Sequence, residues 1–294
     1  MITGKPETVI VREVGPRDGL QAELPLDVAT RTTLIELLIN AGITDIEIAA
    51  FMREDRVPSM AGAEAVVSGT PPRLGLNRYG LVANLKGAER AIATGIRHLT
   101  VTVSLSEQYS KKNVGMSCSD SLAQATEIAS LATQQQCSTD LIISCSFGSP
   151  FHDVNATDDL PPFFAKARAA GVSQVTLADT TGVASPSLLR AIVGQLGTDF
   201  GLHLHDNRGT ALVTAFSALE LGVRRFDTSI GGIGGSPFAP GAMGNLATES
   251  LIHLLDDLGF TTGISLARLF DAGNYLQQIL GRPLPSRLFQ AGPN

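Results

Sequence analysis

The sequence predicts a single (βα)8 barrel (TIM barrel) on three observations. Short β-rich runs alternate with amphipathic stretches along most of the 294 residues, and nothing between neighbouring runs indicates an antiparallel hairpin. This alternation is typical of a parallel sheet. Hydrophobic residues make up 44% of the chain and charged residues only 17%, which suits a sheet buried on both faces. Eight such units in about 230 residues favour closure into a barrel over an open sheet.

Each barrel unit is expected to pair a strand with a helix. The expected strands are residues 9–14, 45–51, 80–85, 98–104, 140–147, 174–180, 202–206 and 225–230. The expected helices between them include residues 31–40, 87–94, 121–134, 160–170, 187–196 and 211–221. Glycine follows several of these helices, as Gly42, Gly171 and Gly222 do. A left-handed residue commonly ends a helix, and glycine adopts that conformation most easily.

We expect one domain over residues 1–294, because no linker rich in proline, serine or charge interrupts the chain. The barrel should occupy about residues 9–260, and a helical tail about residues 264–294. Apolar side chains of this tail, at Leu266, Leu269, Phe270 and Tyr275, could cover either the barrel or a second copy of the chain. We expect a homo-oligomer, most simply a homodimer.

Composition argues against several partners. The net charge of −6 disfavours nucleic acid and anionic membrane surfaces. The sequence contains no apolar run long enough to span a membrane, and its first residues lack the hydrophobic segment of a secretory signal. Three cysteines, Cys118, Cys137 and Cys145, indicate neither a disulfide framework nor a zinc knuckle. We therefore expect a cytoplasmic protein.

Polar residues gather where the predicted strands end. They are Arg17, Asp18, Glu47, Asn84, Ser104, Ser144, Asp179, Thr180, His203, His205, Asp206 and Asp227. Barrel enzymes take their catalytic residues from the carboxyl ends of the strands, so this ring predicts an active site. The sequence leaves open whether Glu47 and Asp227 act in that site or only support the structure.

The segment 201–206 (GLHLHD) is the most informative part of the ring. Side chains alternate faces along a strand, so His203 and His205 should point the same way. Two imidazoles on one face can bind a divalent metal if a carboxylate arrives from elsewhere. An isolated H-x-H pair is more often two strand histidines satisfied by hydrogen bonds, but here the surrounding ring favours a metal site.

A glycine-rich segment, residues 231–245 (GGIGGSPFAPGAMGN), follows the last predicted strand. Six glycines in these fifteen residues let the backbone approach a ligand closely. Such a run alone could be a flexible surface loop. Its position after the eighth strand favours a loop that closes over substrate.

Taken together, these segments resemble 3-hydroxy-3-methylglutaryl-CoA lyase and related metal-dependent barrel lyases. Residues 11–21 (VREVGPRDGLQ) are similar to the family's first-strand signature. The segments 201–206 and 234–249 match its seventh strand, its signature loop and the following helix. Shorter matches are Glu47, residues 84–87, residues 111–113, Asp179, Thr180 and Gly182. The resemblance extends from about residue 9 to about residue 283.

The resemblance implies a role for each matching residue. Asp18, His203, His205 and Asn245 would be the ligands of a divalent metal, Mg²⁺ or Mn²⁺. Arg17 would stabilise a developing enolate, and Asp18 or His203 would take a proton. The residues expected to contact an acyl-CoA substrate are Arg17, Glu47, Asn113, Asp179, Thr180 and Arg208.

The chain departs from the family pattern at two positions. Ser236 occupies the place of a signature-loop cysteine that has an acid–base role in the family. A serine hydroxyl is a weaker acid than a thiol, so it exchanges protons less readily near neutral pH. Cys145, on the fifth predicted strand, is a less favoured alternative source of a thiol. Arg208 replaces an aromatic residue, so we expect the distal end of the substrate to be recognised differently.

The implied reaction is a retro-Claisen cleavage of a 3-hydroxyacyl-CoA to acetyl-CoA and a 3-oxo acid, as in leucine degradation. Two alternatives stay open. The barrel could condense acetyl-CoA with an oxo acid. A regulatory domain after the barrel would favour that activity, and we expect no such domain in this chain. It could also bind a metal and CoA esters without turning them over, but retention of every implied metal ligand argues against this.

Overall fold

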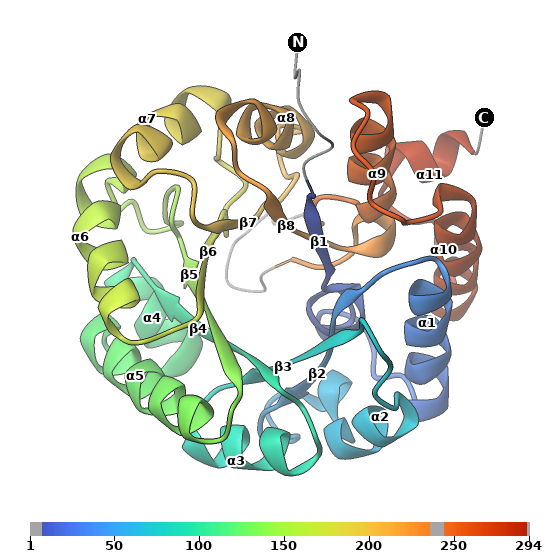
Figure 1. Cartoon of the computed structure of the whole chain (residues 1–294), viewed down its shortest axis with the longest axis horizontal. Helices are drawn as coiled ribbons and strands as arrows, with labels where there is room; N and C mark the ends of the chain where they lie inside the picture. Colours follow the sequence, from blue (N-terminus) through green and yellow to red (C-terminus); the bar gives the residue numbers. More distant parts are fainter. Residues whose placement is uncertain (1–7, 236–243, 293–294) are drawn as a thin grey trace.

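The eight strands close into a parallel barrel in the computed structural model, which describes residues 8–235 and 244–292 (Figure 1). Each strand pairs with the next along the chain, and β8 pairs with β1. The strands are β1 (Ile10–Glu13), β2 (Asp45–Phe51), β3 (Asn77–Val82), β4 (His98–Ser104), β5 (Ser138–Ser144), β6 (Gln174–Ala178), β7 (Gly201–His203) and β8 (Arg225–Thr228). The predicted (βα)8 barrel is confirmed.

A ring of helices surrounds the strands in Figure 1. They are α1 (Val28–Asn40), α2 (Ala63–Gly69), α3 (Leu85–Ala93), α4 (Glu107–Val114), α5 (Cys118–Gln134), α6 (Ala156–Ala169), α7 (Pro186–Leu196), α8 (Ala211–Leu221), α9 (Thr248–Asp257), α10 (Leu266–Leu280) and α11 (Arg287–Ala291). Several begin at a polar side chain that accepts a backbone N–H of the first turn, as Asp27, Asn84 and Ser106 do. Such bonds satisfy donors that the helix itself leaves unpaired.

The main apolar core lies between the strands and the helices. Ile46 and Ile48 on β2 and Leu34, Ile35 and Leu38 on α1 are all fully buried there. The strands are therefore covered on their outer face by helices. Inside the barrel, one group of polar residues, with Asp18 and His203, lies at the carboxyl ends of the strands, and another, with Arg12, Asp140 and Asp227, lies towards their amino ends.

Two strand boundaries differ from the prediction in ways that affect the site. β3 covers Asn77–Val82, three residues earlier than expected, because Asn84 caps α3 instead of ending the strand. β7 ends at His203, so His205 lies just beyond it. The predicted ranges of β2 and β4 match the structure. Helices α2 and α4 were not predicted.

The tail covers the chain's own barrel. Helix α10 packs against α1, and Leu269 and Phe270 on it are buried within the chain. The hydroxyl of Tyr275 donates to the carbonyl of Thr30 at 3.3 Å. Of the two roles left open for the tail, the structure supports covering the barrel.

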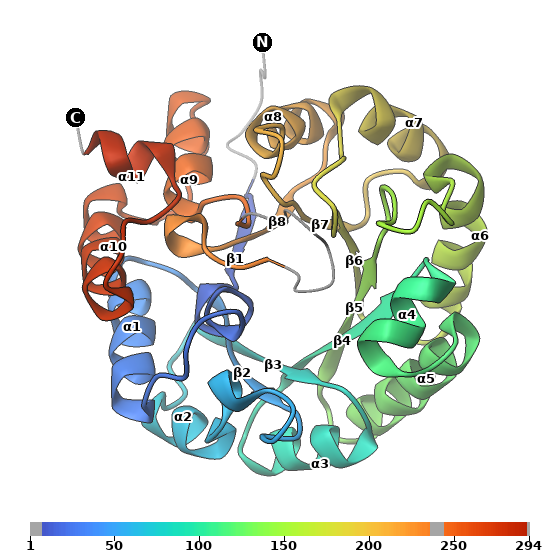
Figure 2. The ribbon, with the colours of Figure 1, turned by 180° about the vertical axis from the view of Figure 1, so that it is seen from behind.

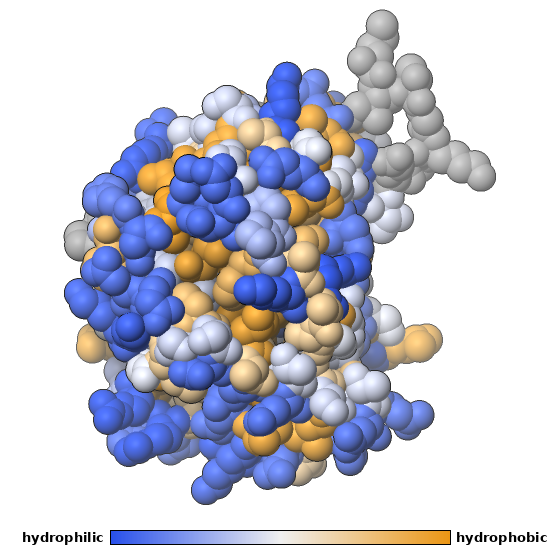
Figure 3. Space-filling model, turned by 90° about the vertical axis from the view of Figure 1, so that its left-hand side faces the viewer, coloured by the Kyte–Doolittle hydropathy of each residue, from blue (hydrophilic) through white to orange (hydrophobic). Residues whose placement is uncertain are grey.

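The outer surface of the barrel is mixed in polarity. Figure 3 faces the side where α5 and α6 lie, and hydrophobic residues there show between hydrophilic ones. A shallow groove on this side is lined partly by Leu122, Ala123 and Phe163. No helix among residues 8–235 and 244–292 is long and apolar enough to cross a membrane. The expected homodimer stays a prediction.

Candidate active site at the carboxyl ends of the strands

The first site residues lie on a tight turn after β1, at the barrel mouth seen in Figure 2. The carbonyl of Val14 accepts hydrogen bonds from the backbone N–H groups of Arg17, Asp18 and Gly19 at 3.1, 2.7 and 3.3 Å. This single π-helical turn projects Arg17 and Asp18 over the open end. Gly15 allows it, because a Cβ there would lie only 2.6 Å from a carboxylate oxygen of Glu13.

Glu13 joins this turn to the loop after β8. Its buried carboxylate accepts the backbone N–H groups of Gly15 at 2.7 Å and Ile230 at 3.0 Å, and the hydroxyl of Thr248 at 2.6 Å. Burial raises the pKa of Glu13 to about 7. The segment before Arg17 is therefore held against the segment that leads to Asn245.

Arg17 is held by two carboxylates. Its Nε donates to Glu47 at 2.5 Å and a terminal nitrogen donates to Asp18 at 2.9 Å, while the residue is only 5% exposed. A second ion pair joins the other terminal nitrogen to Glu47, which also accepts the hydroxyl of Thr100. Glu47 is fully buried and does not line the cavity beside Arg17. It orients Arg17, and the expectation that it contacts substrate is not supported.

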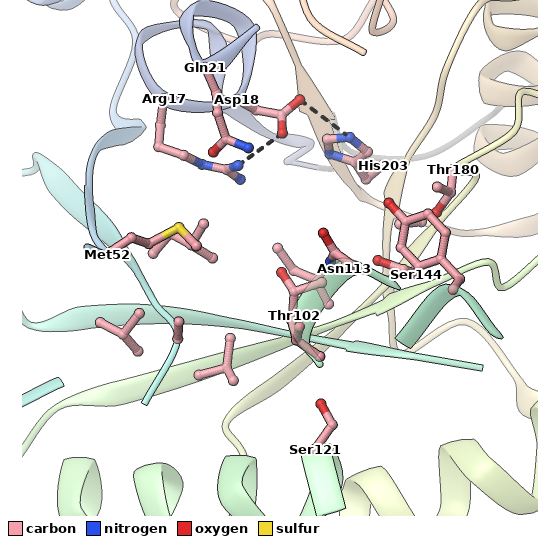
Figure 4. Close-up of a pocket in the computed structure, with 18 of the residues that line it drawn as sticks. Arg17, Asp18, Gln21, Met52, Thr102, Asn113, Ser121, Ser144, Thr180 and His203 are labelled. Atoms are coloured by element: carbon pink, nitrogen blue, oxygen red, sulfur yellow. Dashed lines mark hydrogen bonds and ion pairs between the residues drawn. The ribbon is translucent and has the colours of Figure 1, made fainter. Parts of the chain in front are cut away.

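The two histidines converge on Asp18, as the alternation of side chains predicted. Nε2 of His203 lies 3.2 Å from Nε2 of His205 and 3.9 Å from a carboxylate oxygen of Asp18. One potential ligand atom from each residue lies within 4.8 Å of the others. Figure 4 shows Asp18 between Arg17 and His203.

Asn245 reaches the same cluster from the loop after β8. Its backbone forms an isolated antiparallel bridge with His205, secured by a 2.8 Å hydrogen bond from the N–H of Leu246 to the carbonyl of Leu204. The side-chain nitrogen of Asn245 donates to Asp18 at 2.8 Å. All four expected metal ligands therefore lie together.

These residues fit a divalent cation. Asn245 Oδ1 is buried and has no hydrogen-bond partner in the described part of the chain. Burial and neighbouring His203 lower the pKa of His205 to about 4, so this ring is neutral near pH 7. Burial alone would raise the pKa of Asp18, but Arg17 and His203 lower it overall. One carboxylate, neutral imidazole and an amide oxygen suit a metal such as Mg²⁺ or Mn²⁺.

A cavity of about 170 Å³ opens beside this cluster. Arg17, Asp18, Gln21 and His203 lie along one side of it in Figure 4, and Thr102 and Ser121 lie on the opposite side. Its apolar lining includes Met52, Leu81, Val82, Val101, Ile142 and Met116. A bound molecule could therefore place a polar end at Arg17 and an apolar part against the strands.

The other predicted substrate contacts divide into two groups. Asn113 and Thr180 line the cavity. Asp179 does not, because its carboxylate accepts the N–H groups of Val183 at 2.8 Å and Ala184 at 3.0 Å and so folds the loop after β6. Burial raises the pKa of Asp179 to about 6.

Arg208 does not line the cavity. It is exposed and donates to the carbonyls of Thr181 and Gly182 at 2.7 and 3.0 Å, which joins two loops. Cys145 is fully buried beneath the mouth, does not line the cavity, and burial raises the pKa of its thiol to about 11. It is no substitute acid–base group. Ser236 lies outside the described residues.

Asp227 does not belong to the ring at the mouth. Its carboxylate lies below His203 and pairs with Arg12 inside the barrel. The sequence did not single out Arg12, because nothing in a strand pattern distinguishes a buried arginine from an exposed one. Gln21 and Met52, which line the cavity, were not among the predicted site residues either. Gln21 closes the first-strand signature and Met52 directly follows β2, so position alone could have suggested both.

Comparisons with known proteins agree on one family. The family model described as HMGL-like matches residues 8–276. The (R)-citramalyl-CoA lyase of Chloroflexus aurantiacus is 37% identical, over 98% of this chain and 96% of its own. The hydroxymethylglutaryl-CoA lyase of Bacillus subtilis is 35% identical, over 97% of both chains.

Solved structures show the same likeness. An HMG-CoA lyase from Acinetobacter baumannii, in complex with coenzyme A and 3-methylmalate, is 33% identical to this chain. It aligns with a TM-score of 0.92, covering 100% of this chain and 98% of that one.

Proposed function

The chain belongs to the HMGL-like family, and from this premise we propose that it is a metal-dependent carbon–carbon lyase. Its substrate is a 3-hydroxyacyl-CoA similar to 3-hydroxy-3-methylglutaryl-CoA, which it cleaves to acetyl-CoA and an oxo acid. The observation that carries this proposal is the meeting of Asp18, His203 and His205 beside Arg17 at the mouth of one cavity.

Mg²⁺ or Mn²⁺, held by Asp18, His203, His205 and Asn245, would lower the pKa of the substrate's tertiary hydroxyl. Asp18 and His203 both border the cavity. Of the two, Asp18 is the better proton acceptor once a metal is bound, because a carboxylate keeps free lone pairs whereas the only lone pair of a neutral His203 would be on the metal. As that proton leaves, the hydroxyl oxygen becomes a carbonyl, the C2–C3 bond breaks and its electron pair forms a thioester enolate. A proton must then reach C2, and we propose that Ser236 or a water molecule delivers it.

Arg17 stabilises the enolate. A guanidinium has five N–H donors, and the bonds to Glu47 and Asp18 use one on each of its three nitrogens. One N–H on each terminal nitrogen remains for substrate oxygens. Because Arg17 is fixed before substrate arrives, these donors need little reorganisation as negative charge develops.

The compartment and pathway are also proposals. Cys118, Cys137 and Cys145 are free thiols, which supports a reducing compartment and hence the cytoplasm. A role in leucine degradation would follow if 3-hydroxy-3-methylglutaryl-CoA is the preferred substrate. The identity of the thioester therefore decides the pathway.

The test is a screen for acetyl-CoA release. The metal-free protein is incubated with 3-hydroxy-3-methylglutaryl-CoA, a longer-chain homologue or citramalyl-CoA, each with and without Mg²⁺ or Mn²⁺. We expect metal-dependent release from at least one thioester, and none from an Asp18→Asn variant. No release from any of them, or full release in excess EDTA, would contradict the proposal.

A further inference from the structure

We propose that Asp227 is a positioning residue for His203, and that the fork of Arg12 fixes the carboxylate in the orientation this requires. The proposal rests on the proposed metal site, since it concerns which nitrogen His203 offers to a cation. It assigns a role to Arg12 and Asp227, which are buried inside the barrel and do not line the cavity.

Strand register brings the three residues side by side. In the pairing of β7 with β8, His203 lies opposite Asp227. In the pairing of β8 with β1, Asp227 lies opposite Arg12. Asp227 therefore lies between the arginine and the histidine on three adjacent strands, and all three are at least 93% buried.

The hydrogen bonds follow this order. Arg12 Nε donates to Asp227 Oδ1 and a terminal nitrogen donates to Oδ2, both at 2.8 Å. The same Oδ2 lies 3.2 Å from His203 Nδ1. A bidentate pair of this kind fixes the plane of the carboxylate as well as its position. Asp227 is thus held with one oxygen directed at the imidazole.

This arrangement determines the tautomer of His203. A carboxylate paired with arginine is ionised and can only accept hydrogen bonds. The proton of a neutral His203 must then be on Nδ1, which leaves the lone pair on Nε2. Nε2 is the nitrogen that faces His205 and Asp18, so the ring offers its lone pair to the metal position. A carboxylate behind a metal-binding histidine commonly has this effect.

His205 provides a contrast within the same site. Its Nδ1 is buried without a hydrogen-bond partner among the described residues. Of the two histidines, only His203 has its ring orientation and tautomer fixed by a neighbouring carboxylate, that of Asp227. The two histidines therefore differ before any metal binds: His203 is preorganised and His205 is not.

The remaining contacts of Arg12 are structural and supply a control. Its other terminal nitrogen donates to Asp140 at 2.6 Å, and the guanidinium lies 5.0 Å from the centre of the Tyr79 ring. Asp140 also accepts the hydroxyl of Thr176 at 2.9 Å. Asp140 has no hydrogen bond to His203 or Asp227. Asp140→Asn removes a buried carboxylate from Arg12, as Asp227→Asn does, but leaves the contact with His203 in place.

The first experiment records long-range ¹H–¹⁵N NMR spectra of the metal-free full chain at a pH where His203 is neutral. The chain has only five histidines, and a His203→Gln variant assigns the signal. We expect the Nδ1–H tautomer for His203 in the wild type and in Asp140→Asn, and its loss in Asp227→Asn. An Nε2–H tautomer in the wild type overturns the proposal even if no variant folds.

The second experiment measures Mn²⁺ binding by calorimetry on the same proteins. Asp227→Asn should raise the dissociation constant about 10- to 100-fold, whereas Asp140→Asn should change it less than about threefold. Equal effects of the two variants on tautomer and affinity would make Asp227 purely structural. The tautomer measurement uses neither metal nor substrate. A failure of the proposed lyase activity therefore does not refute the role of Asp227, and a wrong tautomer does not refute the lyase activity.

Discussion

The two ends of the barrel interior use the same kinds of residue but pair them differently. Towards the amino ends of the strands, Arg12 bonds to Asp140 and Asp227, so each charge has an opposite charge in contact. At the carboxyl ends, Asp18, His203 and His205 crowd together, and Asn245 Oδ1 is buried without a hydrogen-bond partner in the described chain. An unpartnered buried polar atom costs free energy unless a ligand completes it. The second group therefore marks the site.

Arg17 and Arg12 make this comparison testable, because both are buried arginines held by two carboxylates. Only Arg17 lines the cavity with Asp18 and His203. Arg17→Lys should lower kcat about 100-fold or more, since lysine cannot reproduce the fork that contacts the enolate. Steady-state kinetics on the thioester found in the screen, with a thermal melt, measures this.

The melting temperature and the Mn²⁺ affinity of Arg17→Lys should stay close to those of the wild type. If turnover falls by only a few-fold, or if the variant loses rate only because it unfolds, Arg17 is a structural residue like Arg12. The proposed difference between the two ends of the barrel would then be wrong.

Asp140→Asn tests the opposite end. It weakens a buried, charge-assisted contact to Arg12, so the free energy of unfolding should fall by about 2 kcal/mol. The kcat of the folded variant should stay within a few-fold of the wild type, because Asp140 does not line the mouth cavity. Urea denaturation together with kinetics gives both numbers. A large loss of rate without loss of stability would show that this end of the barrel has a direct catalytic role.

The smallest effect is expected at Ser236, where the chain departs from its family. If this position transfers a proton, Ser236→Cys should raise kcat a few-fold on the preferred thioester, because a thiol is the stronger acid. Ser236→Ala is the matched control. A chain adapted to serine for another substrate would instead lose rate in Ser236→Ala and gain nothing from cysteine. Equal rates for all three proteins would remove Ser236 from the mechanism.

Sequence periodicity predicted the barrel and most of the metal site. Alternation along a strand determines that His203 and His205 share a side, and the structure places their Nε2 atoms 3.2 Å apart. The match of the first-strand segment to the family's signature brought in Asp18. These predictions succeeded because they depend on local geometry or on a motif of neighbouring residues.

Predictions that depend on where a side chain points after folding were less successful. Glu47 and Asp227 lie within strands and Asp179 follows one, yet their carboxylates bond to Arg17, to Arg12 and to two backbone N–H groups, respectively. Each of these partners is distant in the sequence or depends on the exact shape of a loop. A strand pattern shows that a carboxylate faces inward, but it does not show whether a cation inside the barrel has already paired with it.

Mn²⁺ binding to the metal-free protein tests the site most directly. Calorimetry or electron paramagnetic resonance on the wild type should give one Mn²⁺ per chain, and Asp18→Asn and His203→Ala should each abolish binding. His253→Ala, which changes an exposed histidine on α9, should bind as the wild type does. Absence of stoichiometric binding in the wild type, or equal binding by all four proteins, would contradict a metal site at the mouth of this barrel.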